Sequence, residues 1–179
     1  MRHRVVRLVL TGWILLAAAP VAWAGGAGDE WVGRPAPDFT LQDLDGTTYR
    51  LSDVIGEKIV WLNFWGLRCG PCIRELPVLQ VLWDRYRDKG LLLLGVNADG
   101  VDAAFIRKQF EGREDLRRAG VTFPLAPDPE FGVIDAYGLM GAPLNVMIDR
   151  KGVIRFRHEG YEAGDEVRYE ALLKQLLAE

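Results

Sequence analysis

The sequence predicts an α/β domain in which helices flank a mixed β-sheet. Two apolar runs of strand length, 59–65 and 91–97, enclose a helical pattern, which is the strand–helix–strand order of a parallel pair. Two further apolar runs, 144–149 and 153–157, are joined by a turn signal ending in Gly152, which predicts an antiparallel hairpin in the same sheet. A chain of 179 residues is long enough for one domain with a substantial core.

The first 24 residues have the pattern of an export signal. A stretch with three arginines precedes an apolar run, and Ala22-Trp23-Ala24 fits the small-x-small rule for cleavage. The alternative is an uncleaved membrane anchor, although the apolar run is short for a span, which needs about 20 residues. Both interpretations place the domain outside the cytoplasm, and we expect a periplasmic location, where disulfides persist.

We expect a signal peptide at 1–24, a linker at 25–34 and one domain at 35–179. The formal net charge of the chain is −3, and removing the signal, with its three arginines and no acid, would lower it to −6. This charge argues against a nucleic-acid partner, which requires a basic surface.

The first half of the domain begins with a small hairpin. Residues 39–41 and 48–51 flank Asp45-Gly46, which is a turn signal. The continuous apolar run 59–65 predicts a central strand buried on both faces. The helical pattern that follows ends at Gly90, before the second buried strand at 91–97.

The second half of the domain adds three helices and the late hairpin. Residues 101–118 form a charged amphipathic pattern with a possible break near Gly112, and 131–137 has the pattern of a short helix. After the hairpin at 144–157, apolar spacing in 166–177 predicts a terminal helix.

The two cysteines of the chain, Cys69 and Cys72, lie where the central strand meets its helix. Free N–H groups and the helix dipole favour an anion there, so Cys69 is the candidate nucleophilic thiolate. Cys72 lies one turn deeper and is placed to resolve a mixed disulfide. Gly70 and Pro71 separate them, and Pro71 makes the turn rigid. The pattern predicts thiol–disulfide exchange rather than a permanent bridge, because stable bridges usually close longer loops.

Three neighbouring side chains extend this candidate site. Glu75, on the same helical face as Cys72, could hold the proton that Cys72 loses and regains; a solvated first-turn acid is the alternative. Arg68 precedes the nucleophile, where its charge would stabilise the thiolate and could steer acidic partners, unless it simply faces solvent. Trp65 is interpreted as a core or site-rim aromatic that supports the motif. We expect no metal site, because Cys69, Cys72 and His158 offer only three candidate ligands.

Four motifs in order carry a resemblance to a known family. They are Gly33-Arg34-Pro35-Ala36-Pro37-Asp38-Phe39, Leu41-x-Asp43-Leu44-Asp45-Gly46, Asn63-Phe64-Trp65-Gly66-x-x-Cys69-Gly70-Pro71-Cys72-x-x-Glu75-x-Pro77, and Gly141-Ala142-Pro143 before Val146-x-Ile148-Asp149. From about residue 35 onward the chain resembles the exported TlpA/ResA-like thiol-disulfide oxidoreductases of the thioredoxin superfamily. The resemblance implies a thioredoxin-like fold with an N-terminal β-hairpin extension. It also implies Cys69 as the attacking cysteine, Cys72 as the resolving one, Glu75 as the nearby acid and Pro143 as a cis-proline beside them.

The chain departs from the family pattern at the substrate groove. Arg68 stands where the family usually has tryptophan, and Leu144-Asn145 stands where it usually has Thr-Thr. Asn63 occupies the place of the buried acid of cytosolic thioredoxins, so Glu75 would have to take that role alone.

The resemblance implies a monomeric reductase of periplasmic protein disulfides, without a cofactor and fed by a membrane electron donor. Its protein substrates would include the haem-binding thiols of apocytochrome c. A thiol oxidase or isomerase is the alternative, because direction depends on the reduction potential. A Sco-type copper chaperone using Cys69, Cys72 and His158 is a third hypothesis, although the cysteine spacing argues against it. A peroxiredoxin is disfavoured, because Gly66 stands where that family needs threonine.

Overall fold

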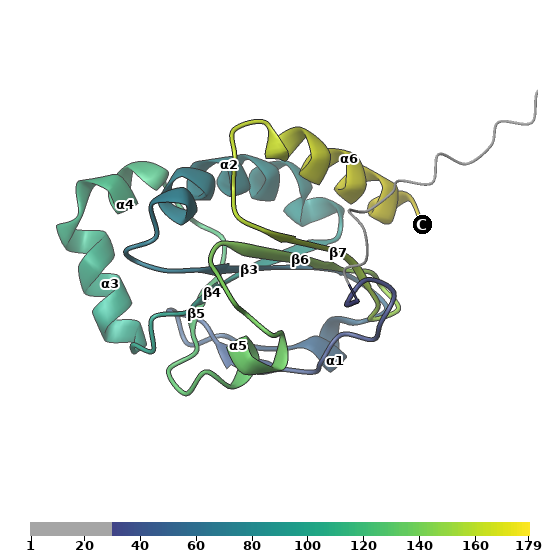
Figure 1. Ribbon diagram of the computed structural model, residues 1–179, viewed down its shortest axis with the longest axis horizontal. Helices are drawn as coiled ribbons and strands as arrows, with labels where there is room; N and C mark the ends of the chain where they lie inside the picture. Colours follow the sequence, from purple (N-terminus) through teal and green to yellow (C-terminus); the bar gives the residue numbers. More distant parts are fainter. Residues whose placement is uncertain (1–29) are drawn as a thin grey trace, which may run out of the picture.

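The computed structural model describes residues 30–179, which form a mixed β-sheet between two layers (Figure 1). The expected signal peptide at 1–24 lies outside the described residues. The strands are β1 (Thr40–Gln42), β2 (Thr48–Arg50), β3 (Ile59–Trp65), β4 (Leu91–Asn97), β5 (Leu125–Pro127), β6 (Leu144–Ile148) and β7 (Ile154–Glu159). The helices are α1 (Leu51–Val54), α2 (Gly70–Tyr86), the 3-10 turn Arg87–Lys89, α3 (Ala103–Gly112), α4 (Glu114–Ala119), α5 (Gly132–Ala136) and α6 (Asp165–Ala178).

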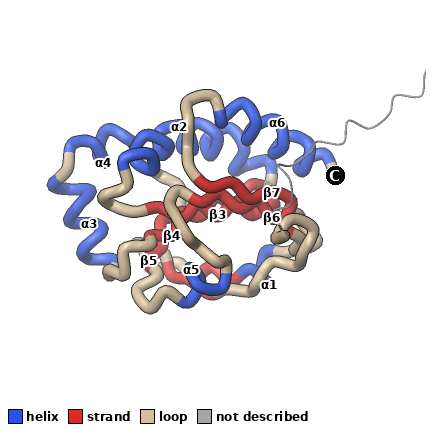
Figure 2. Tube along the Cα trace, in the orientation of Figure 1, coloured by secondary structure: helices blue, strands red, loops and turns tan. Residues whose placement is uncertain are grey.

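The main sheet has the strand order β5-β4-β3-β6-β7 (Figure 2). Strand β3 runs parallel to β4, with Ile59 opposite Leu91 and Trp65 opposite Asn97. Strands β6 and β7 are antiparallel to their neighbours, and β1 and β2 form a separate antiparallel hairpin. The predicted α/β class, the mixed sheet and the N-terminal hairpin are therefore confirmed.

The two faces of the sheet bury two separate cores. Helices α2 and α6 cover one face together with α4, whereas α1, α5 and the β1–β2 hairpin lie against the other (Figure 1). Because side chains alternate along a strand, Trp61 and Trp65 of β3 point to the α2 side and Phe64 points to the α5 side. Asn63 lies between the two tryptophans on the α2 side and is fully buried, so the first core contains a polar group that needs partners.

Two short elements were not predicted from the sequence. Strand β5 has only three residues and pairs with the end of β4, where Gly95 N–H donates to the carbonyl of Pro124 at 2.9 Å. Helix α1 is a single turn of four residues. Neither element is long enough to show a periodic pattern. The predicted break near Gly112 is present between α3 and α4.

The described part of the expected linker makes contacts with the domain. Gly33 N–H donates to the carbonyl of Ile154 at 2.8 Å, and Ile154 N–H donates back to Arg34 at 2.9 Å. Trp31 packs against the core on the α5 side. Within residues 30–179, none of the helices combines the length and apolar character that a membrane crossing requires.

Candidate active site

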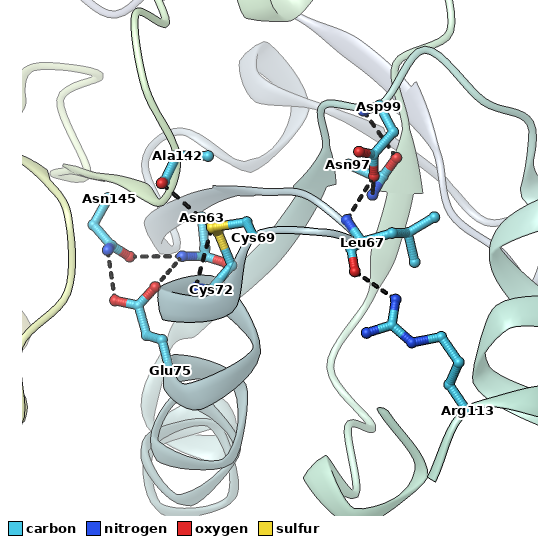
Figure 3. Close-up of a disulfide and its surroundings, with 10 residues drawn as sticks. All are labelled: Asn63, Leu67, Cys69, Cys72, Glu75, Asn97, Asp99, Arg113, Ala142 and Asn145. Atoms are coloured by element: carbon cyan, nitrogen blue, oxygen red, sulfur yellow. Dashed lines mark hydrogen bonds between the residues drawn. A yellow bond between two sulfur atoms is a disulfide. The ribbon is translucent and has the colours of Figure 1, made fainter. Parts of the chain in front are cut away.

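The two cysteines form a disulfide at the junction between β3 and α2 (Figure 3). Cys69 is the N-cap residue of α2, and its sulfur accepts a hydrogen bond from Cys72 N–H at 3.2 Å. Gly70 begins the helix and Pro71 occupies its first turn, where a missing N–H leaves no bond unmade. A thiolate on Cys69 would therefore accept the Cys72 N–H and lie at the positive end of a helix of 17 residues.

The two cysteines differ in their exposure to solvent. Cys72 is 1% exposed, whereas Cys69 is only partly buried. The sulfur of Cys69 lies 3.3 Å from the carbonyl oxygen of Ala142, and the peptide bond between Ala142 and Pro143 is cis, as expected. The buried Pro143 thus lies beside the pair, and Cys69 is the more accessible of the two cysteines.

A charged clamp holds the loop that leads into Cys69. The carboxylate of Asp99 accepts a bond from Leu67 N–H at 2.7 Å, and Arg113 donates to the carbonyl of the same residue (Figure 3). Gly66 lies against Asp99, because a Cβ there would be 3.2 Å from the carboxylate. The backbone of Leu67 is therefore held at both its N–H and its carbonyl, which fixes the conformation of the loop before Cys69.

Glu75 is fully buried below the disulfide and meets three hydrogen-bond donors. Asn63 Nδ2 donates to Oε2 at 2.9 Å, and Asn145 Nδ2 and the Tyr169 hydroxyl donate to Oε1 at 2.7 and 3.1 Å. Figure 3 shows the side chains of both asparagines pointing toward the carboxyl group. Glu75 is therefore a buried acid and not the solvated first-turn acid that the sequence left open.

Burial raises the pKa of Glu75 from 4.5 to about 7, because desolvation penalises the charged form. The bonds from Asn145, Asn63 and Tyr169 lower the pKa and oppose part of this effect, while the charge of Asp165 raises it slightly. A carboxyl group with a pKa near neutrality can accept and return a proton at physiological pH.

The two remaining predicted residues have different surroundings. Arg68 is exposed, and within residues 30–179 no carboxylate lies within ion-pair distance of it. Trp65 is fully buried and makes an edge contact with Phe110, with ring centroids 6.0 Å apart. Trp65 is thus part of the core behind the site and does not line its rim.

The sequence did not identify four residues that shape the site. Asn145 drew notice only as a departure from the family pattern, and no signal marked Tyr169, Asp99 or Arg113. Arg113 lies between α3 and α4, and Tyr169 comes from the last helix, so only the tertiary fold brings them to residues 66–75.

The described residues hold no cluster of three or more His, Cys, Asp or Glu side chains suited to a metal ion. His158 lies on β7, with Nε2 3.4 Å from the carboxylate of Asp165. Its other close contacts are with the rings of Phe156 and Tyr169.

Residues 32–157 match the model of the AhpC/TSA family. The chain belongs to this family. A curated relative from Geobacillus thermodenitrificans, the thiol-disulfide oxidoreductase ResA, is 40% identical over 69% of this chain and 67% of its own length. The ResA of Bacillus thuringiensis subsp. konkukian is 34% identical over 81% of this chain and 78% of its own length.

Solved structures agree with this family. A Chlorobium tepidum protein named as a thiol:disulfide interchange protein DsbE is 30% identical, with a TM-score of 0.71, over 82% of this chain and 97% of its own. The exposed lipoprotein thioredoxin Etrx1 of Streptococcus pneumoniae is 29% identical, with a TM-score of 0.64, over 78% of this chain and 100% of its own. The fold is thioredoxin-like, and this AhpC/TSA protein is a thiol-disulfide oxidoreductase.

Proposed function

We propose that this AhpC/TSA protein is exported and reduces disulfides of other exported proteins through Cys69. The observation that carries the proposal is the asymmetry of the pair. Cys69 is partly exposed at a helix N-cap, whereas Cys72 is buried with a fully buried acid three residues further along the helix. The sulfur of Cys69 can therefore react with a substrate disulfide, while the sulfur of Cys72 remains in the interior until the mixed disulfide has formed.

The exchange proceeds in two displacements. The Cys69 thiolate attacks one sulfur of the substrate disulfide and expels the other as a thiolate, which takes a proton from water. Cys72 then gives its proton to the Glu75 carboxylate and attacks the Cys69 sulfur, which expels the second substrate thiolate. The protein dithiol becomes a disulfide, the substrate disulfide becomes a dithiol, and two electrons pass to the substrate.

The charge of Glu75 supports the reducing direction. No cation contacts this carboxyl among the described residues; its partners are two amides and a hydroxyl. A buried negative charge near Cys72 disfavours a thiolate and so favours the disulfide over the reduced pair. A protein whose disulfide is favoured is a better electron donor when reduced.

Two features support the proposed setting. The first 24 residues have an export-signal pattern, and one structural relative is named an exposed lipoprotein. Outside the cytoplasm a reductase needs a source of electrons, which we assign to a membrane donor. Apocytochrome c, with its pair of haem-binding cysteines, is a candidate substrate for a monomeric reductase of this kind.

Acid-quenched thiol trapping of the protein in cells tests the direction. We expect the cysteine pair to be mostly reduced although its compartment is oxidising, because a donor supplies it with electrons. A mostly oxidised pair would favour a thiol oxidase or isomerase instead.

A further inference from the structure

Two of the hydrogen-bond donors to the Glu75 carboxyl group are side-chain amides, whose orientation is not determined by their chemistry alone. Asn63 and Asn145 each carry an amide, which can present either its NH2 group or its oxygen to a neighbour. An NH2 group favours the carboxylate, whereas an amide oxygen favours the carboxylic acid. The proton affinity of Glu75 therefore depends on what holds each amide in its orientation.

Trp61 determines the orientation of the Asn145 amide. Its indole Nε1–H can only donate, and it lies 2.9 Å from Asn145 Oδ1. Asn145 must keep its oxygen on Trp61, which turns its Nδ2 to Glu75 at 2.7 Å. Asn63 Nδ2 also donates to Asn145 Oδ1 at 3.1 Å, so the second amide takes its orientation from the first.

We propose that Trp61 and Asn145 are positioning residues, in which the indole N–H of Trp61 fixes the Asn145 amide so that only its N–H faces Glu75. The proposal rests on the role of Glu75 in the proposed function. Trp61 makes no hydrogen bond to Glu75, and its effect passes through one amide. The arrangement opposes the cost of burial and keeps the carboxylate available as a base near neutral pH.

Other titratable groups face Glu75 from three places. Asp165 and Tyr169 belong to α6, and Tyr161 precedes that helix. Burial, and to a lesser extent the charge of Glu75, raises the pKa of both tyrosines. His158 of β7 contacts Asp165 and Tyr169 and not Glu75 itself. Cys72 belongs to α2 and does not titrate while it is disulfide-bonded. The disulfide form is therefore suited to measuring Glu75, because both tyrosines and the cysteine pair keep one state near neutral pH.

The experiment is a carboxyl NMR titration of the disulfide form of the protein labelled with ¹³C-glutamate, in which Glu75→Gln identifies the signal. In Asn145→Ala, we expect the Glu75 midpoint to rise by about one pH unit or more, because a donor to a charged group is lost. In Trp61→Phe, we expect a smaller rise, because the freed amide can turn its oxygen to the protonated acid. The double variant should match Asn145→Ala alone.

Trp83→Phe is the matched control, because the buried Nε1 of Trp83 has no hydrogen-bond partner in the described structure. It should leave the midpoint unchanged. An unchanged midpoint in Asn145→Ala, or a Trp61→Phe shift that adds in full to it, would overturn the proposal. If Asn145→Ala does not fold, Asn145→Leu removes the same donor with a similar shape. The titration does not involve exchange, so a failed reductase assay leaves its result intact.

Discussion

Replacing Glu75 by glutamine removes the buried acid that lies below the disulfide, and the effect on stability should depend on pH. The pKa of Glu75 is raised from 4.5 to about 7 by burial. Between these values the unfolded chain has released the proton while the folded protein still holds it. The free energy of unfolding of the wild type therefore falls as pH rises through this window.

The size of the effect follows from the shift. A difference of one pKa unit corresponds to about 1.4 kcal/mol, so the Glu75 contribution changes by about 3 kcal/mol between pH 4 and pH 8. The Glu75→Gln variant lacks this contribution. The NH2 group of glutamine would face groups that themselves donate hydrogen bonds. This mismatch lowers the free energy of unfolding of the variant by an amount that does not depend on pH.

The assay is denaturant unfolding of the disulfide form, followed by tryptophan fluorescence, at several pH values from 4 to 8. The wild type should lose stability relative to Glu75→Gln by about 3 kcal/mol across this range, and little of the change should lie above pH 8. Parallel stability curves for the two proteins would contradict the raised pKa of Glu75, because they would mean that Glu75 ionises alike in the folded and unfolded states.

Three further predictions concern the loop, the nucleophile and the sheet. Arg68→Gln should raise the pKa of the attacking thiol, measured by the pH dependence of alkylation, by less than about half a unit, because water screens an exposed charge. Arg113→Gln should lower the free energy of unfolding by about 1 kcal/mol and slow exchange, because it removes the bond to the Leu67 carbonyl, whereas Arg118→Gln, which breaks only an exposed pair, should change neither. Gly95→Ala should cost about 1 to 3 kcal/mol in denaturant unfolding, because the new Cβ would lie 2.5 Å from a buried leucine; an equally stable variant would contradict that close approach.

The sequence predicted the parts of the fold that have long periodic patterns. Strand β4 matches its predicted range of 91–97, and β3 matches 59–65, because continuous apolar runs identify buried strands. Strand β5 has three residues and ends in Pro127, so it exists through its pairing with β4 rather than through a local pattern.

The candidate site was predictable where it is local in sequence. The cysteine pair, Glu75 and Pro143 lie in short motifs that the family resemblance covers. The partners of Glu75 were not predictable, because Asn145 and Tyr169 reach it across 70 and 94 residues of chain. An asparagine in a strand and a tyrosine in a helix have no signal of their own, and only the packing of α6 on the sheet brings them together.

Capture of a mixed disulfide shows directly which of the two cysteines attacks a substrate disulfide. The reduced Cys72→Ser variant is incubated with a protein disulfide, and the site of linkage is found by mass spectrometry. We expect a stable adduct through Cys69, and only a trace of adduct through Cys72 in the matched Cys69→Ser variant, because Cys72 is 1% exposed. Equal adducts in both variants, or none in Cys72→Ser, would contradict the assignment of Cys69 as the attacking cysteine.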